Sequence, residues 1–532
     1  MKLKKIGGLL AAIALVSACV DVDEQLGDNL IPGNQDYTFY TTTIDIDDVE
    51  MMQADSLSGF NLYRITFGAI RDDGLFGLSK RTSAFYIVPV ADTLDFGKAG
   101  TQKFIKFHLS APLDTVSCAN PNQANILQNV NVFALDEPMD MSKGAPELKY
   151  DNSKRITKGI PVFNGLDSLS FDFTVAYAEK YLTITQEELD SLNLYLKRFP
   201  GIVISTDDPV GEGGRINMFE LPISVASSAI TGSYANLYFS AEYDGVQKDT
   251  CMTFYLGPVS KYDMSGVTAT NISSYPQIAY TLSEHSSKGM EGPASDIVYF
   301  EGGRGIKPVI KAAPIKEKLA AEIRSKGGDP SSVIINKATL ELPFEFPDDY
   351  KKMDLYPTTL SPTCRVVGDD GSASFVGITD NSISEEDPGT INRSLLKYTP
   401  DISYHLQQMI RLEDDSKISN YDVWFLAMAD ETITTSTTTD SEMSEYYQQL
   451  AYQSYYSSMY SGYGYGSYGG YGSYYSNYYN YMMMASMMNT SSTSTETQTL
   501  MDAHRYYRGI LNGPTASRKP KLKVIYAIPK EN

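Results

Sequence analysis

Alternating apolar and polar residues dominate the chain from about residue 37 onward. Residues 169–175 read Leu-Ser-Phe-Asp-Phe-Thr-Val, and residues 338–346 alternate in the same way. A period of two places every second side chain on the same face, so each segment predicts a strand with one buried and one solvent-facing side. Similar patterns at 105–109 and 522–528 predict further strands, and Asp244-Gly245 between two apolar runs predicts a hairpin. We therefore expect a mainly β fold.

Apolar residues spaced three or four apart predict only three short helices. The segment 185–199 opens with a capping box formed by Thr185 and Glu188. Apolar stripes over 315–323 and 402–410 predict the other two helices.

The order of these elements repeats along the chain. Each half is expected to contain three strands, one helix and one further strand, at 103–109, 130–135, 169–175, 185–199 and 201–205, and again at 334–346, 363–367, 394–398, 401–411 and 422–428. The repetition predicts two tandem antiparallel β-sandwiches of jelly-roll type, at 37–262 and 263–532, with the join between Gly257 and Thr270.

The first eighteen residues carry a targeting signal rather than part of this fold. A lysine-rich start at 2–5 precedes an uncharged apolar stretch at 6–15. This stretch is shorter than the ~20 residues that span a bilayer as a helix, and it is typical of a cleavable signal peptide. The pair Ser17-Ala18 before Cys19 resembles a bacterial lipobox. We expect cleavage before Cys19 and a lipid on its thiol; the alternative is an ordinary signal peptide with a chance cysteine.

Residues 19–36 are polar and are expected to form an acidic tether. Asp21, Asp23 and Glu24 follow the cysteine closely. Acids at this place resemble the surface-export signal of lipoproteins from Bacteroides-type bacteria. We therefore expect an outer-membrane protein exposed at the cell surface, and the alternative is a periplasmic location.

Charge and cysteine content narrow the classes of partner. The formal net charge is −21, which argues against nucleic acid and anionic lipid surfaces as partners because both would repel the chain. Besides Cys19 there are three cysteines, Cys118, Cys251 and Cys364. Their wide spacing and odd number fit neither a disulfide framework nor a metal site, so buried free thiols are expected.

A low-complexity segment interrupts the second predicted sandwich at about 432–499. It is rich in tyrosine, glycine, serine and methionine, and is flanked by ordinary domain sequence. We interpret it as a loop insertion, with a short helix at Glu442 to Tyr456. Tyrosine suits sugar stacking and protein contact, and the candidate contact residues are Tyr463, Tyr465, Tyr468 and Tyr471. The alternative is a tolerated insertion without a ligand.

Signals for catalysis are weak throughout the chain. The four histidines, His108, His285, His405 and His504, show no metal-ligand spacing, and each is expected at the surface or rim of a sandwich. Nucleophile-elbow and zinc-protease motifs are absent from the sequence. Pairs of acids such as Asp47-Asp48 lie in predicted turns, where loose calcium sites are the alternative to simple solvation. We therefore expect no enzyme activity, no cofactor and no catalytic metal.

Five short motifs resemble the Asp-Ser/Thr-apolar acceptor of O-glycosylation in Bacteroides-type bacteria. The candidate acceptors are Ser56, Thr93, Thr115, Ser168 and Ser191. The motif is short, so we expect one or two of them to be used.

Several stretches, in this order, resemble the domain of unknown function 4270 family of Bacteroides-type outer-membrane lipoproteins. They are Phe67 to Gly77, Phe199 to Ile204, Phe300 to Gly303, Ile335 to Leu340 and Pro520 to Val524. Two features depart from the family pattern: Gly74 stands where proline is usual, and the tyrosine-rich insertion is peculiar to this chain. The resemblance implies a surface or outer-membrane lipoprotein, and it supplies no catalytic residues.

These observations favour a non-catalytic surface lipoprotein, held to the membrane through Cys19, that binds protein partners as an accessory of an outer-membrane assembly or transport machine. The alternative is a glycan-binding adhesin that uses the tyrosine tract or a sandwich face. An extracellular hydrolase is the third hypothesis.

Overall fold

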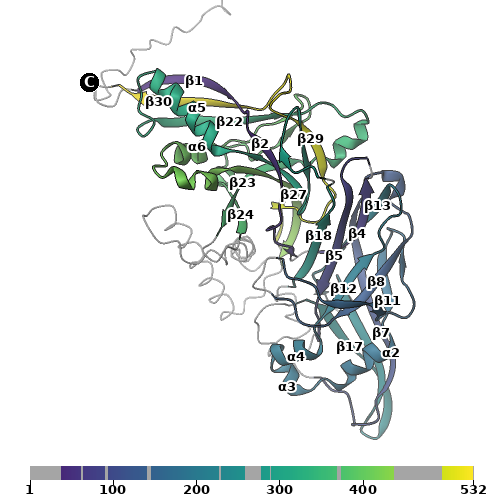
Figure 1. The fold of residues 1–532 in the computed structure, drawn as a ribbon. Helices are drawn as coiled ribbons and strands as arrows, with labels where there is room; N and C mark the ends of the chain where they lie inside the picture. The colour runs from purple at the N-terminus through teal and green to yellow at the C-terminus, as the bar shows by residue number, and fades with distance from the viewer. Residues whose placement is uncertain are drawn as a thin grey trace, which may run out of the picture.

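The computed structural model describes residues 37–61, 64–72, 74–89, 94–140, 145–226, 229–257, 277–287, 289–367, 373–435 and 494–530. The predicted fold class is confirmed: the chain is mainly β, with antiparallel sheets and a few short helices. Figure 1 shows two bodies side by side, each with its own large apolar core. We call the body built from strands between Phe60 and His285 the first sandwich. The second sandwich is built from strands at Tyr37–Gln53 and from those after Gly292.

One continuous sheet forms the first sandwich. Its strands are β3 (Phe60–Asn61), β4 (Arg64–Asp72), β5 (Gly77–Phe85), β6 (Ile87–Pro89), β7 (Lys103–Ser117), β8 (Gln128–Leu135), β9 (Tyr150–Arg155), β10 (Val162–Phe163), β11 (Ser168–Asp172), β12 (Ile202–Thr206), β13 (Gly213–Glu220), β16 (Tyr234–Tyr243), β17 (Val246–Leu256) and β18 (Ala279–His285). The order is β10-β8-β12-β5-β4-β13-β7-β16-β17-β6, with β11 on β7, β18 on β5 and β9 on β8. Strand β6 follows β5 directly in the chain, yet β5 lies in the middle of this order and β6 pairs with β17 at its end. The sheet therefore curls around its core. A separate short pair is formed by β14 (Ser224–Ala226) and β15 (Ala229–Thr231).

The second sandwich has two larger sheets. Its strands are β1 (Tyr37–Asp45), β2 (Val49–Gln53), β19 (Gly292–Pro293), β20 (Ile297–Glu301), β21 (Ile306–Ile310), β22 (Ile334–Pro343), β23 (Thr359–Val367), β24 (Ala373–Gly377), β25 (Ile391–Asn392), β26 (Lys397–Tyr398), β27 (Val423–Thr435), β28 (Ser494–Met501), β29 (Arg508–Asn512) and β30 (Lys521–Pro529). One sheet has the order β1-β30-β22-β26-β25. The other has the order β19-β2-β21-β27-β23-β24 with β28 on β27, and β20 pairs with β29.

Helices are few and short, as predicted. They are α2 (Val175–Ala178), α3 (Gln186–Leu189), α4 (Leu192–Arg198), α5 (Ala312–Ser325) and α6 (Ser403–Ile410), with 3-10 turns at Pro121–Gln123, Glu179–Thr183, Tyr350–Leu355, Thr379–Ser382 and Asp415–Tyr421. Both predicted apolar stripes are confirmed, because Leu319 of α5 and Leu406 of α6 are fully buried in the second core. Within the described part of the chain, no helix has the length and apolar character needed to cross a membrane.

Four predicted elements differ in detail. The strand expected at 334–346 ends at Pro343, and the strand expected at 394–398 comprises only Lys397–Tyr398. The helix expected at 185–199 starts with the predicted capping box of Thr185 and Glu188, but it consists of α3 and α4 with a break at Asp190 and Ser191. The strand expected at 169–175 ends at Asp172, because Thr174 accepts a hydrogen bond from the Tyr177 amide and caps α2. A local capping interaction therefore overrides the alternating pattern there.

The predicted repeat has a counterpart in how the strands pair. In the first sandwich β7 pairs with β11, while β8 pairs with β12, the strand after the helices. In the second sandwich β22 pairs with β26, while β23 pairs with β27, again the strand after the helix. The neighbours extend the match, since β16 lies beside β7 as β30 lies beside β22. These strand pairs thus correspond in the two halves, although they belong to one sheet in the first sandwich and to two sheets in the second.

The predicted domain ranges, 37–262 and 263–532, need correction. All nine residues of β1 pair with β30, from Tyr37 opposite Pro529 to Asp45 opposite Lys521, and β2 pairs with β21. The start of the chain therefore belongs to the second sandwich. Conversely, β18 lies beyond residue 263 but pairs with β5 of the first sandwich. Alternation predicts a strand and its buried face, but it does not predict which distant strand completes the sheet.

The strands beside the tyrosine-rich segment form an antiparallel pair. β27 and β28 pair from Met428 opposite Met501 to Thr435 opposite Ser494. The insertion predicted at about 432–499 is therefore shorter, because its first and last residues extend this ladder. The predicted helix at Glu442 to Tyr456 lies outside the described residues.

Candidate functional site

The histidines occupy different environments from those predicted. His108 lies on the partly exposed face of β7, as expected, with Nδ1 2.7 Å from Asp172 Oδ1. His405 and His504 are buried, and the side chain of His285 is only 2% exposed, which contradicts the expected surface positions of all three. Two of them, His285 and His504, belong to polar groups between the two sandwiches.

His285, the last residue of β18, lies between a serine and a glutamate. Its Nε2 is 2.9 Å from Ser283 Oγ, and its Nδ1 is 3.2 Å from Glu301 Oε1. The Arg81 guanidinium lies 3.1 Å from Nε2 and can only donate, which assigns the ring proton to Nδ1, where Glu301 accepts it. Burial lowers the pKa of His285 to about 4, although Glu301 opposes this effect. The imidazole is therefore neutral at neutral pH.

Buried charges of both signs surround this histidine. Arg81 donates from Nε to the Ala503 carbonyl at 3.1 Å, and Lys307 donates to the carbonyl oxygen of Glu301. Burial lowers the pKa of Lys307 to about 7. The carboxylate of Asp502, also buried, attracts the Arg81 guanidinium. Arg81 and Lys307 thus face two carboxylates, which limits the net charge enclosed there.

The segment from Asp502 to Arg508, between β28 and β29, connects the second sandwich to the first. We call it the interdomain segment. Its contacts with the first sandwich include His504 Nδ1 with Thr66 Oγ1 at 2.8 Å, the Tyr506 amide donating to Ser117 Oγ at 2.9 Å, and an ion pair of Arg508 with Asp72. Burial lowers the pKa of His504 to about 4, so this ring is also neutral at neutral pH.

The carboxylate of Glu431 in β27 accepts hydrogen bonds from arginines of both sandwiches. Arg64 of β4 donates from Nη1 to Glu431 Oε1 at 2.5 Å, and Arg505 donates to the same oxygen at 2.6 Å. Arg64 also forms an ion pair with Asp114. The side chains of Arg64 and Glu431 are only 9% and 10% exposed, so solvent screens this pair weakly. We call all of these groups the interdomain polar cluster: Arg64, Thr66, Arg81, Ser283, His285, Glu301, Lys307, Glu431, Asp502, His504 and Arg505.

The contacts of Ser283, His285 and Glu301 have the order of a serine-hydrolase triad. In such a triad the base takes the serine proton while the acid orients the imidazole. Substrate must also reach the nucleophile, but Ser283 is 5% exposed and Glu301 is 1% exposed. A substrate could reach Ser283 only if the sandwiches separated. In the closed arrangement the three residues satisfy one another's hydrogen bonds, as buried polar groups require.

Cys364 and His405 form a second pair with a nucleophilic side chain. The sulfur is 3.9 Å from His405 Nδ1, while His405 Nε2 donates to the Tyr421 carbonyl at 3.0 Å. Burial raises the pKa of the Cys364 thiol to about 12. The reactive thiolate is therefore scarce, and the pair fits a structural role. Cys118, Cys251 and Cys364 are free; Cys251 is exposed, which contradicts its predicted burial.

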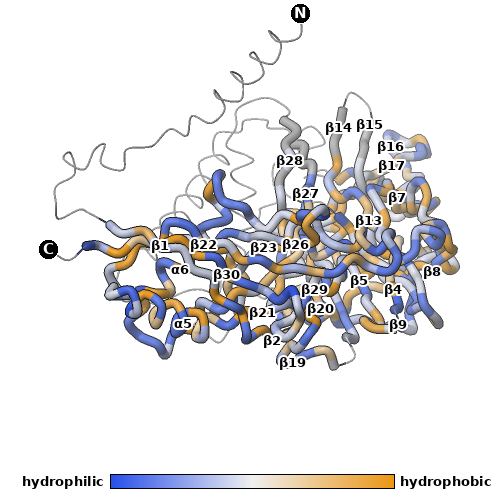
Figure 2. Tube along the Cα trace, turned by 90° about the horizontal axis from the view of Figure 1, so that it is seen from above, coloured by the Kyte–Doolittle hydropathy of each residue, from blue (hydrophilic) through white to orange (hydrophobic). Residues whose placement is uncertain are grey.

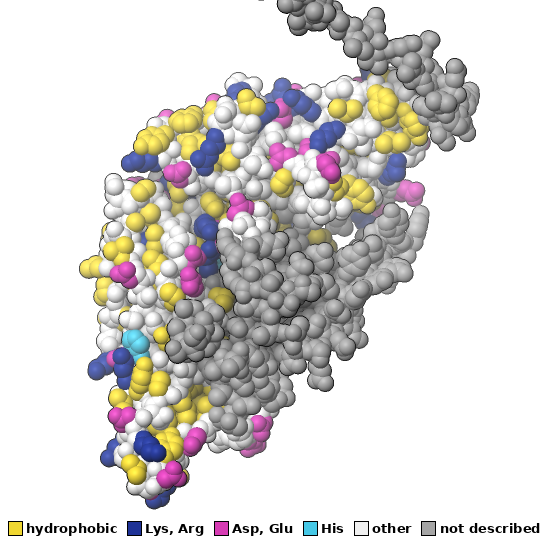
Figure 3. Space-filling view, turned by 180° about the vertical axis from the view of Figure 1, so that it is seen from behind, with side chains coloured by type: hydrophobic (Ala, Val, Ile, Leu, Met, Phe, Trp, Pro, Cys, Tyr) yellow, Lys and Arg dark blue, Asp and Glu magenta, His cyan; other side chains and the backbone are white. Residues whose placement is uncertain are grey.

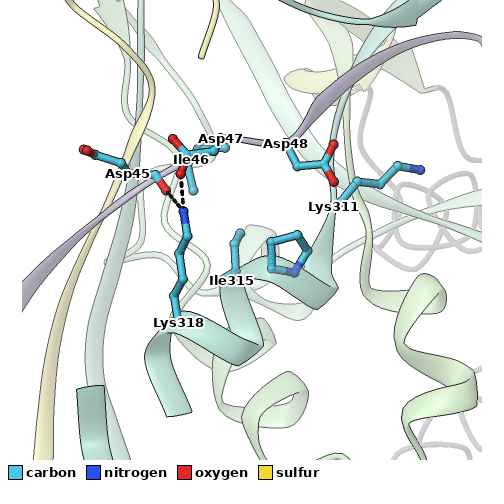
Figure 4. Close-up of a pocket in the computed structure, with 8 residues that line it drawn as sticks. Asp45, Ile46, Asp47, Asp48, Lys311, Ile315 and Lys318 are labelled. Carbon is cyan, nitrogen blue, oxygen red and sulfur yellow. Dashed lines mark hydrogen bonds and ion pairs between the residues drawn. The ribbon is translucent and has the colours of Figure 1, made fainter. Parts of the chain in front are cut away.

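Figure 4 shows a shallow pocket where the β1–β2 turn passes over the start of α5. It is lined by Asp45, Ile46, Asp47, Asp48, Lys311, Pro314, Ile315 and Lys318. Lys318 donates to the Asp45 carbonyl at 2.9 Å and to Asp47 Oδ2 at 2.5 Å. Asp47 and Asp48 are exposed turn residues, as predicted. Among the described residues no group of three or more His, Cys, Asp or Glu side chains is placed to hold a metal ion.

The candidate glycosylation sites differ in exposure. Ser168 begins β11 and is exposed, whereas Thr115 and Ser191 are partly covered. The Ser56 hydroxyl is buried and has no hydrogen-bond partner in the described part of the chain. Thr93 lies outside the described residues. Ser168 is thus the most accessible of the four acceptors that the structure describes.

The remaining predicted site residues, Cys19, Tyr463, Tyr465, Tyr468 and Tyr471, lie outside the described residues. Sequence reasoning missed the interdomain polar cluster. One local signal was available: residues 502–508 read Asp-Ala-His-Arg-Tyr-Tyr-Arg, a dense run of hydrogen-bonding side chains beside a strand. The partners of this run come from positions 66 to 431, and nothing in the sequence assigns them to it.

Comparison with known proteins gives no relative for this chain. No family model matches the sequence, and the comparisons with curated proteins and with solved structures found no match.

Proposed function

We propose that this chain is a non-catalytic surface lipoprotein of the outer membrane that acts as a rigid binding scaffold. It is anchored through lipid on Cys19 and contacts protein partners of an outer-membrane assembly or transport machine. The observation that carries this proposal is the interdomain polar cluster, which joins two sandwiches into one body.

The position of the anchor supports a scaffold that projects from the membrane. Tyr37, the first described residue, pairs with Pro529 at the free edge of the second sandwich. Figures 1 and 2 both place β1 and β30 at one end of the molecule, with β7 and β17 of the first sandwich toward the other. A tether that enters at Tyr37 would hold the second sandwich near the membrane and leave the first sandwich available to partners.

The burial and hydrogen bonding of the histidine and cysteine side chains support a non-catalytic role. The side chains of His285, His405 and His504 are enclosed and hydrogen-bonded, and the Cys364 thiol is protonated. A catalytic histidine needs contact with substrate and a pKa near the working pH. Burial lowers the pKa of His285 and of His504 to about 4. Neighbouring side chains already occupy both ring nitrogens of His285 and the Nδ1 of His504.

The second candidate function is a glycan-binding adhesin. The observation in its favour is the antiparallel ladder of β27 and β28, which brings Thr435 and Ser494 together at the two ends of the tyrosine-rich segment. Such a ladder would present that segment from one point of the second sandwich. Tyrosine rings suit stacking on sugar rings.

Detergent-gentle purification of the tagged, lipidated chain separates the two candidates. A scaffold should co-purify in constant ratio with an outer-membrane barrel protein, and a variant lacking residues 453–488 should retain that partner. An adhesin should purify alone, bind a glycan array, and lose that binding in the same deletion variant.

The hydrolase hypothesis has its own test at Ser283. A fluorophosphonate probe labels a serine only when a base activates it and the probe can reach it. We expect no labelling of the native chain, because Ser283 is buried with its neighbours. Labelling that disappears in Ser283→Ala but persists in Ser168→Ala would contradict a non-catalytic scaffold.

A further inference from the structure

The outer face of the five-stranded sheet is apolar at the end where the described chain begins. Four side chains there are large and exposed: Tyr37 at 39%, Phe39 at 65%, Ile334 at 36% and Ile525 at 41%. Soluble sheets with one free face usually carry polar residues on it. These four residues contribute nothing to the core, so folding does not explain their character.

Strand register places these side chains on the same face. Phe39 of β1 is opposite Ala527 of β30, and Ala527 is opposite Ile334 of β22. Directly opposed residues share a face, as do residues two apart on a strand, which adds Tyr37 and Ile525. We call the group of Tyr37, Phe39, Ile334 and Ile525 the anchor-end patch. In Figure 3, hydrophobic side chains gather at the upper right, at the end of the molecule that carries β1 and β30.

The opposite face of the same strands packs against the core of the second sandwich. Tyr40 stacks on Tyr526 with ring centroids 5.6 Å apart, and Leu522, Val524 and Tyr526 lie in the core beneath α5 and α6. The anchor-end patch is therefore a second apolar face of a sheet whose first face is already buried. A cluster of this kind marks a contact with something other than the chain's own core.

We propose that the anchor-end patch rests on the surface of the bilayer that holds the lipid of Cys19. This inference builds on the lipid anchor of the proposed function. The eighteen residues from Cys19 to Asp36 end at the patch itself. A fully extended chain of that length reaches about 65 Å, whereas a flexible coil spans about 25 Å on average. The tether thus keeps the patch close to the leaflet at an effective concentration on the order of mM, where weak contact suffices.

The residue types of the anchor-end patch and its border fit a membrane interface better than a buried protein–protein interface. Phenylalanine and isoleucine suit the acyl boundary, and tyrosine is enriched at the level of the headgroups. Farther along the same face come Thr41, Thr43 and Lys523, which is opposite Thr43. The Lys523 side chain is 55% exposed, and its ammonium forms an ion pair with Glu341 at 3.0 Å. Lysine at such a border can lay its stem on the apolar zone while its ammonium stays among headgroup phosphates. The anchor-end patch with this lysine border matches the layering of a leaflet.

Tryptophan quenching in vesicles tests the proposal. The chain has one tryptophan, Trp424, which is 5% exposed and gives a constant background. Lipidated Phe39→Trp protein is reconstituted into phosphatidylcholine vesicles with and without brominated phosphatidylcholine, which quenches tryptophan on contact. The matched control is Val246→Trp, at the turn of the β16–β17 hairpin, where the native side chain is 56% exposed. We expect the added tryptophan at position 39 to lose at least half of its emission, and the one at position 246 to lose none.

Equal emission at position 39 with and without brominated lipid, in protein that floats with the vesicles, would overturn the proposal and leave the lipid anchor intact. Protein that does not float would instead contradict the anchor. In that case the unlipidated Phe39→Trp chain is titrated with the same vesicles: quenching there supports the patch, and its absence overturns it. A Tyr37→Ser/Phe39→Ser/Ile525→Ser variant, with native unfolding behaviour, should weaken vesicle binding of the unlipidated chain at least fivefold.

Discussion

Individual buried charges decide how the two sandwiches are joined. Arg64 brings a guanidinium from the first sandwich to Glu431 of the second, and Arg81 reaches the Ala503 carbonyl. Removing water from such groups is expensive, so each charge needs its partner. Specific residues of the interdomain polar cluster should therefore affect stability far more than surface ion pairs do.

Replacing Arg64 with Met should lower the free energy of unfolding by about 3 kcal/mol, because Asp114 and Glu431 lose a buried counter-charge. The control is Lys98→Met, which breaks the exposed pair with Glu242 and should change stability by less than ~1 kcal/mol. Urea unfolding of both variants measures the difference. Equal stability of the two variants would mean that the cluster does not hold the interface.

The pH dependence of stability follows from the buried histidines. Burial is the main cause that lowers the pKa of His285 and of His504 to about 4, against 6.5 in the unfolded chain. Between pH 6.5 and 4 the unfolded state binds more protons, so stability falls as the pH falls, by ~1.4 kcal/mol per pH unit for each histidine. Denaturation midpoints at pH 7 and pH 5 should therefore differ. The His285→Gln/His504→Gln variant should show a flatter pH dependence; an unchanged slope would contradict the assignment.

Exposure should select among the glycosylation motifs. Ser168 is exposed at the start of β11, while the Ser56 hydroxyl is buried. We expect peptide mass spectrometry of native protein to find a glycan at Ser168 and none at Ser56. Loss of Ser168 through Ser168→Ala should remove one glycan mass from the intact protein, with Ser56→Ala as the matched control. A glycan on Ser56 alone would contradict selection by exposure.

At the scale of elements, periodicity predicted the positions of strands well, but it did not predict which strands pair with each other. The alternation at 105–109, 338–346 and 522–528 marks β7, β22 and β30, and the Asp244-Gly245 turn joins β16 to β17. Both turn residues have positive φ, 52° and 78°, as a tight two-residue hairpin requires. By contrast, β1 pairs with β30 although almost the whole sequence separates the two strands. No local pattern encodes this pairing.

The same limit applies to the candidate site. The sequence shows that Ser283 and His285 lie two apart on a strand, and therefore on one face. It does not show that Glu301 and Arg81 meet them, because those contacts depend on how the sandwiches pack. Burial of a histidine is a property of this packing rather than of its neighbours in the chain.

The β27–β28 ladder predicts that the tyrosine-rich segment is dispensable for folding. Deleting residues 453–488 and joining the ends with a short Gly/Ser linker should leave the melting temperature within a few degrees of wild type, because loop length changes stability only slowly, by ~0.6 kcal/mol per doubling. The control deletion also removes 432–435 and 494–497, which belong to the ladder, and should lower the melting temperature clearly. Unfolding caused by the first deletion would mean that the tyrosines build part of the core.

At the scale of the whole molecule, the two sandwiches form one body, and the proposed lipid anchor would give this body a membrane end and a free end. The second sandwich carries Tyr37, where the proposed tether would enter, and the first sandwich lies beyond the interdomain polar cluster. A rigid joint fixes the distance between the membrane and the far sandwich, which a flexible joint would not do. This arrangement serves a scaffold only if the lipid anchor exists.

The most direct measurement of the central claim is therefore the fractionation of Cys19→Ser against wild type in intact cells. Wild-type protein should be found in the outer-membrane fraction and be cleaved by protease added outside the cells. The Cys19→Ser protein should keep its signal peptide or appear in the soluble fraction, while Cys251→Ser, which changes an exposed thiol of the folded body, should behave as wild type. A Cys19→Ser protein that is processed normally and still sediments with the outer membrane would contradict the account.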